Sequence, residues 1–157
     1  METLTKDNRV FLPEVVRLVR EGHRVKIVAK GYSMRPFVED GRDMLVFDAP
    51  GAFAVGDVVL AEYAEGSYVC HRIVRMEGEV VTLRGDGNVR GVEIVRRTDV
   101  LAKVVQIERK GKLYDLASSR CWRWYSTVWC SLLPIRRYLL AVYRHLWLKV
   151  ERWSLRR

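Results

Sequence analysis

Apolar and polar residues alternate in short runs through the first two thirds of the chain, a period typical of β-strands. Before these runs, Leu12, Val15, Val16 and Val19 repeat at helical spacing and Gly22 follows as a C-cap, which predicts a short helix over about 11–21. Strands are predicted at about 24–29, 44–47, 58–63, 68–75, 80–84 and 100–108. Short strands, frequent glycines and one early helix indicate a mainly antiparallel β domain.

Beyond about Asp115 the chain becomes aromatic, basic and helical in character. Pro134, a residue accepted in the first turn of a helix, is expected to begin a second tail helix. An apolar stripe at spacings of three and four follows it, made of Ile135, Leu139, Val142, Leu146, Val150 and Trp153. We therefore divide the chain into a β domain, residues 1–116, and a basic amphipathic helical tail, residues 117–157.

Charge separates the same two parts. The net charge is +9, and residues 120–157 contain nine Lys or Arg, one acid and all five tryptophans. A basic amphipathic helix with tryptophans indicates binding to an anionic membrane surface. Packing of the stripe on the β domain or on a partner helix is the alternative. Nucleic acid is disfavoured as a partner, since nothing in residues 1–116 indicates a nucleic-acid-binding fold.

The hairpin predicted over 68–84 brings two polar residues together. If Glu77 and Gly78 form a two-residue turn, His71 faces Arg84, and Asp86 becomes its diagonal neighbour on the same face. An imidazole and a carboxylate can close that gap. A register slip of one residue would send Asp86 to the opposite face.

Ser33 lies in a loop between two predicted strands and is a candidate nucleophile. A serine hydroxyl needs a base within hydrogen-bond reach, and the base needs an orienting group. His71 could take the proton and Asp86 could hold the imidazole, with the Ser33 amide aiding the oxyanion. Each of these residue types is more often structural in such a setting, so spacing alone leaves catalysis a minority interpretation.

Four short motifs in order give the chain a family resemblance. They are Ser-Met-Arg-Pro at 33–36, Gly-Asp-Val-Val at 56–59, His-Arg-Ile-Val at 71–74 and Gly-Asp-Gly-Asn at 85–88. This set resembles the type I signal peptidases and the related LexA-type serine peptidases. Histidine at position 71, where the common bacterial enzymes carry lysine, is similar to the archaeal, endoplasmic-reticulum and sporulation-type branch.

The resemblance implies a signal-peptidase-like β fold and a serine endopeptidase that cleaves a peptide or protein precursor. It implies Ser33 as nucleophile, His71 as base and Asp86 as supporting acid, with no metal or organic cofactor. The supporting positions are Gly31, Met34, Pro36, Asp57, Gly85 and Asn88. Among them, Asp57 has the alternative role of shaping its turn. Two other functions stay open: a non-catalytic or regulatory peptide-binding module docked through the C-terminal helices, and a self-cleaving regulator.

The family's membrane-spanning helix has no counterpart among the apolar runs of this sequence, and no secretory leader pattern precedes Ser33. We therefore expect a cytoplasmic protein. Through its tail, the protein is expected to bind peripherally to the inner face of the membrane. Cys70, Cys121 and Cys130 lack metal-ligand spacing, and we expect reduced thiols. Cys70 adjoins His71 on a predicted strand, so the two side chains should point to opposite faces.

Overall fold

The computed structural model describes residues 8–154, and the side chains of residues 11–147 within them. The strands are β1 (Val25–Val28), β2 (Asp43–Asp48), β3 (Val58–Ala64), β4 (Ser67–Glu77), β5 (Val80–Arg84), β6 (Glu93–Arg96), β7 (Val100–Arg109) and β8 (Lys112–Asp115). The helices are α1 (Asn8–Arg20), the short 3-10 turn η1 (Arg97–Asp99), α2 (Arg120–Ser131) and α3 (Arg136–Ser154).

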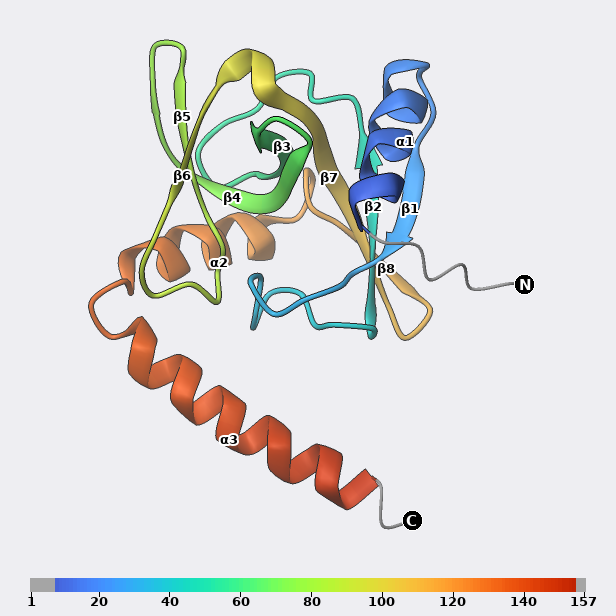
Figure 1. Ribbon diagram of the computed structural model, residues 1–157. Coiled ribbons are helices and arrows are strands. Elements are labelled where there is room, and N and C mark those ends of the chain that lie inside the picture. Colours follow the sequence, from blue (N-terminus) through green and yellow to red (C-terminus); the bar gives the residue numbers. More distant parts are fainter. Residues whose placement is uncertain (1–7, 155–157) are drawn as a thin grey trace.

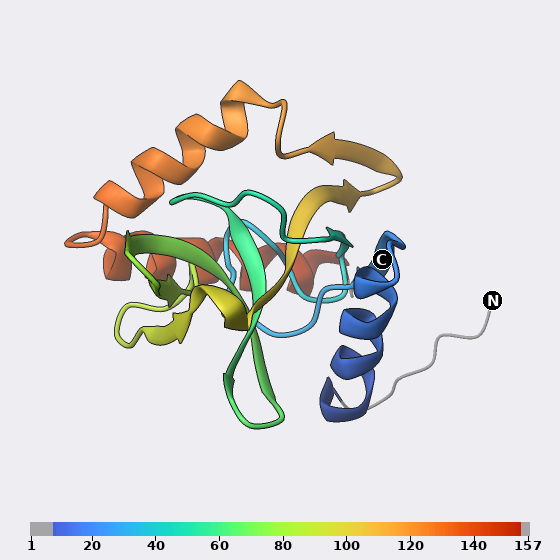
Figure 2. The ribbon, with the colours of Figure 1, turned by 90° about the horizontal axis from the view of Figure 1, so that it is seen from above.

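The eight strands form one antiparallel sheet in the order β1-β2-β7-β3-β4-β5-β6, with β8 paired to β7. Helix α1 lies beside β1 and β2, while α2 and α3 lie along other sides of the curled sheet (Figures 1 and 2). The expected architecture is thus confirmed at this level: a mainly antiparallel β fold with a short N-terminal helix and a helical C-terminal part. The predicted helix and six predicted strands are present, and β6 and β8 are additional.

Alternation along the strands sends apolar side chains into two clusters. The larger cluster joins α1 to the sheet through residues that include Val15, Val19, Phe47 and Leu60. The smaller one contains Val59, Ala61, Ile73, Val81, Leu83, Val95 and Val100. Neighbouring side chains of β4 therefore point to opposite faces of the sheet. Cys70 packs with the larger cluster and its neighbour His71 does not, as the period of two predicted.

Helix α2 packs directly on the larger cluster. Ser119 caps it by accepting a hydrogen bond from the Trp122 amide. The rings of Trp122 and Tyr125 contact Phe37 at centroid distances of 4.8 and 5.5 Å. The division predicted between residues 116 and 117 falls in the connection from β8 to α2, and α2 itself shares the core of the β domain.

Helix α3 begins at Arg136, two residues after the proline expected to start it. The Arg136 guanidinium donates to the Trp129 carbonyl oxygen at 2.6 Å, which fixes α3 to the end of α2. Further along, the Tyr143 hydroxyl donates to Glu39 at 2.9 Å, and the Trp147 ring lies under the Arg42 guanidinium, 5.4 Å from its centre. Within residues 8–154, no helix combines the length and the apolar character needed to cross a bilayer.

The predicted register of the β4–β5 hairpin is wrong by one residue at the site. Glu77 pairs with Val80, which makes Gly78 and Glu79 the turn, and an irregularity between Ile73 and Arg75 shifts the pairing again. Arg72, and not His71, is the residue opposite Arg84. Because of this slip, Asp86 lies on the same face of the sheet as Arg72 and not on the face of His71.

Candidate active site

Ser33 is half-buried in the loop that connects β1 to β2. Gly31, at φ 90°, opens this loop in a conformation that side-chain-bearing residues rarely adopt, and its amide donates to the Asp40 carboxylate at 2.7 Å. Met34 anchors the loop by burying its side chain in the larger cluster, and its carbonyl accepts from the Val38 amide at 2.9 Å. The loop is therefore held at both sides of Ser33.

The chain after β5 meets the serine loop across the curled sheet. The Gly87 amide donates to the Ser33 carbonyl oxygen at 2.7 Å. A Cβ built on Gly85 would lie 3.0 Å from His71 Nε2 and 2.9 Å from Asn88 Nδ2, and closer still to the Ser33 carbonyl oxygen. Because Gly85 has no side chain, the Ser33 backbone, the His71 imidazole and the Asn88 amide can all lie close to it.

His71 is buried and carries a carboxylate partner on its far nitrogen. Its Nδ1 lies 2.7 Å from Oε2 of Glu93, on β6. A proton on Nδ1 leaves Nε2, the nitrogen near Gly85 and Ser33, as the acceptor. Within the described residues, no hydrogen bond joins His71 to Ser33 Oγ.

The structure does not bring Asp86 to His71. Both carboxylate oxygens of Asp86 are taken by Arg72, whose Nε and Nη2 donate at 2.8 and 2.6 Å. Since Arg72 faces Arg84, the diagonal neighbour at position 86 lies on the Arg72 side of the sheet. Sequence reasoning missed Glu93. The alternation Val-Glu-Ile-Val-Arg after Gly91 is the strand signal that could have placed it.

Arg72 joins the β domain to α2. Its Nη1 donates to the Gly56 carbonyl at 2.7 Å and to Ser126 Oγ at 2.5 Å, and its guanidinium lies 4.4 Å from the centre of the Phe37 ring. Burial lowers the pKa of Arg72, but the Asp86 carboxylate outweighs burial and raises it above the ordinary value. Arg72 and Asp86 are thus a charged, fully buried pair.

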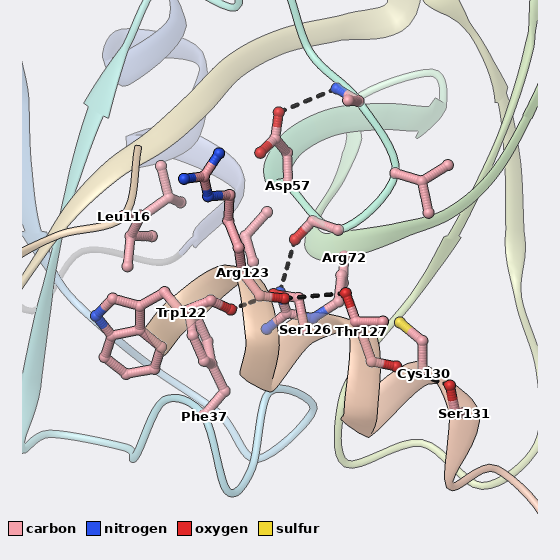
Figure 3. A pocket seen from close by; sticks show the side chains of 15 residues that line it. Phe37, Asp57, Arg72, Leu116, Trp122, Arg123, Ser126, Thr127, Cys130 and Ser131 are labelled. Atoms are coloured by element: carbon pink, nitrogen blue, oxygen red, sulfur yellow. Dashed lines mark hydrogen bonds between the residues drawn. The ribbon is translucent and has the colours of Figure 1, made fainter. Parts of the chain in front are cut away.

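A cavity of about 440 Å³ lies on this Arg72 side, between α2 and the chain around 54–58. Figure 3 shows Trp122, Ser126 and Cys130 of α2 along one wall. Asp57 lines the opposite wall, where its carboxylate accepts from the Ala54 amide at 3.0 Å and so shapes the turn before β3. Neither Ser33 nor His71 lines this cavity, so the candidate nucleophile and base lie outside it.

Cys70, the half-buried thiol next to His71, packs as a core residue does. Burial raises the pKa of Cys70 to about 12, which suppresses the nucleophilic thiolate at neutral pH. Cys70 packs with the larger cluster, on the face opposite His71. A Cys–His nucleophile therefore has no geometric basis here, whereas a serine nucleophile is still compatible with the site.

In the part of the chain that the structure describes, no group of three or more His, Cys, Asp or Glu side chains could hold a metal ion. No protein-family model, curated protein or solved structure matches the chain.

Proposed function

We propose that the chain is a serine endopeptidase of the signal-peptidase-like superfamily that cleaves a peptide or protein precursor. Ser33 is the nucleophile, His71 the general base and Glu93 the carboxylate that orients the base. Asp86, which the motif resemblance favoured for that role, instead holds Arg72 in this proposal. The cytoplasmic, peripheral location expected from the sequence is part of the same proposal.

One observation carries the proposal: a buried histidine whose Nδ1 is bound to Glu93 presents its other nitrogen to the space at Gly85 that the Ser33 backbone also borders. This is the order of groups that a serine nucleophile requires, base next to the serine and acid behind the base. Catalytic hydrogen bonds are often longer before substrate binds, so the missing Ser33–His71 bond is compatible with it.

The reaction follows from these roles. His71 Nε2 takes the Ser33 hydroxyl proton while Oγ attacks the scissile carbonyl carbon, and Glu93 stabilises the imidazolium. The imidazolium then gives its proton to the leaving amine, and the peptide C–N bond breaks to leave an ester on Ser33. Water, activated by the same imidazole, hydrolyses that ester and releases the acid product.

The ordered motifs and the sheet support the same proposal at the level of fold. The serine motif follows edge strand β1, and the histidine motif lies on β4 in the middle of the sheet. The other edge, β6, carries Glu93. An extended substrate that adds to a free strand edge beside Ser33 would present its carbonyl to the nucleophile.

Labelling with a fluorophosphonate probe tests the proposal without knowledge of the substrate. We expect a covalent adduct on Ser33 that is lost in Ser33→Ala and retained in Ser67→Ala, a serine-to-alanine change on β4. Removal of the base in His71→Asn should slow labelling by about 10²–10⁴-fold. Peptide mass spectrometry of cells with wild type against Ser33→Ala should then reveal a precursor that persists uncut.

The competing functions give different results in the same experiments. A peptide-binding module gives no adduct at Ser33, and a natively folded wild-type protein without that adduct would overturn the peptidase. A self-cleaving regulator gives an adduct, but its only cleaved precursor is the chain itself.

A further inference from the structure

Helix α3 has two apolar faces, and the β domain uses only one of them. Its inward face consists of residues spaced by four, three and four: Arg136, Leu140, Tyr143 and Trp147, all buried or half-buried. Tyr143 and Trp147 bind Glu39 and Arg42, at the end of the serine loop. The position of α3 on the body is therefore fixed by contacts that leave the rest of its surface free.

The second apolar face is exposed along the described length of the helix. It begins one residue before α3 and consists of Ile135, Tyr138, Leu139, Val142 and Leu146, which we call the outer stripe. Spacings of three and four place these side chains on one face. The stripe expected from the sequence is thus exposed over its first four members, Ile135, Leu139, Val142 and Leu146. The side chains of its last two members, Val150 and Trp153, lie outside the described residues.

The basic charge of the helical segment indicates which partner the outer stripe binds. Arg137 and Arg144 are exposed on α3, and the segment 120–157 carries nine basic residues against one acid. A second copy of the chain seated on this face would bring two such basic helices together, and like charges oppose that contact. An apolar stripe that bears a tyrosine, on a helix whose other sides carry exposed arginines, fits the interface of an anionic bilayer, where acyl chains and headgroup charge lie side by side.

We propose that the outer stripe binds the surface of an anionic lipid bilayer, with α3 lying in the plane of the interface. A neighbouring face of the same helix, with Tyr143 and Trp147, holds Glu39 and Arg42, so binding would bring the end of the serine loop near the membrane surface. This inference rests on exposure and charge alone and is independent of any peptidase activity.

Co-sedimentation of the full chain with vesicles tests it. We compare vesicles of neutral phosphatidylcholine with vesicles that also contain phosphatidylglycerol, and expect binding to the anionic vesicles that high salt weakens. Leu146→Glu should reduce the partition coefficient by at least about tenfold, because it places a carboxylate in the bound face. Leu113→Glu, on β8, is the matched control: Leu113 is 61% exposed and Leu146 57% exposed.

Three results would overturn the proposal. The first is that wild type binds neither vesicle. The second is that Leu146→Glu and Val142→Glu both bind as wild type does, and the third is that light scattering shows a dimer that Leu146→Glu dissociates. Thermal unfolding of each variant shows whether it is folded, and substitution of such exposed side chains leaves no cavity. The readout is vesicle binding, so the outcome stands whether or not Ser33 is a nucleophile.

Discussion

Glu93 and Asp86 differ in the group that each carboxylate meets. Glu93 meets the imidazole of His71 on one face of the sheet, and Asp86 meets the guanidinium of Arg72 on the other. An exposed edge strand supplies the first acid, while the second is fully buried with its partner. In the proposed function, catalysis depends on Glu93 and stability on Asp86, and two isosteric substitutions can separate these roles.

Glu93→Gln is expected to impair chemistry while the fold survives. The amide can donate to Nδ1, which favours the tautomer with the proton on Nε2 and removes the acceptor from the serine side. The rate of fluorophosphonate labelling at Ser33 should fall by about 10²–10⁴-fold. The midpoint of urea unfolding should stay near that of wild type.

Asp86→Asn is expected to do the reverse. Loss of the carboxylate leaves the Arg72 charge buried without its counter-ion, at a cost of about 3–5 kcal/mol in the free energy of unfolding. Urea denaturation followed by tryptophan fluorescence measures this loss. Unchanged stability with abolished labelling would return Asp86 to the role of catalytic acid that the motifs favoured.

At the scale of elements, six of the eight strands could be predicted from the sequence, and their registers could not. The alternation of apolar and polar residues locates β4 and β5, because it can be read along each strand without knowledge of the strand's partner. Register depends on which two residues form the turn, and Glu77-Gly78 and Gly78-Glu79 are both acceptable choices. The irregularity between Ile73 and Arg75 leaves no trace in the apolar pattern, yet it decides which residue faces Arg84. The proposed nucleophile and base could thus be named from motifs, whereas the carboxylate next to the proposed base required the pairing.

Asp43, the first residue of β2, ties the end of the serine loop to β7. Its fully buried carboxylate accepts from Arg42 at 2.8 Å, from Arg109 at 2.9 Å and from the Glu39 amide at 2.9 Å. Burial raises the pKa of Asp43, but these hydrogen bonds outweigh burial and hold it at about 2, below the ordinary 3.8. The carboxylate therefore stabilises the fold only while it is ionised.

This depressed pKa predicts a loss of stability in acid. The contribution is complete above pH 4 and disappears as the pH falls from about 4 to 2, with a loss of about 2 kcal/mol. Urea unfolding at a series of pH values measures it. Asp43→Asn should flatten the curve in that window, whereas Asp48→Asn should change it less, because the Asp48–Arg24 pair is largely exposed. Parallel acid curves for wild type and Asp43→Asn would contradict the assignment.

At the scale of the whole molecule, α2 belongs to the body and α3 lies across it. Trp129 of α2 is 7% exposed, stacks on Tyr125 and donates from Nε1 to the Asp86 carbonyl at 3.1 Å. The sequence predicted a separate aromatic tail, since its charge and composition change near Asp115. Composition does not reveal that Trp122, Tyr125 and Trp129 face inward, because that depends on where Phe37 and Arg72 emerge from the sheet.

Two tryptophan substitutions on α2 test this integration. Trp129→Ala should lower the free energy of unfolding by about 3–5 kcal/mol, because it empties a buried site and frees the Asp86 loop. Trp124→Ala, one turn away but 70% exposed, should change it by less than about 0.5 kcal/mol. Thermal and urea unfolding measure both. Equal, small effects would mean that the helical segment is independent of the β domain.

The dependence of the Asp86 loop on α2 has a consequence for the order of events during synthesis. Ser33 leaves the ribosome early, and His71 and Glu93 follow it before any residue of α2 is made. The loop at 85–88, which holds the Ser33 carbonyl, gains its contacts with Ser126, through Arg72, and with Trp129 only after the α2 segment has emerged. A nascent chain would thus carry every proposed catalytic group before it could hold them in place. For the proposed peptidase, such a delay would keep the unfinished chain from cutting neighbouring proteins.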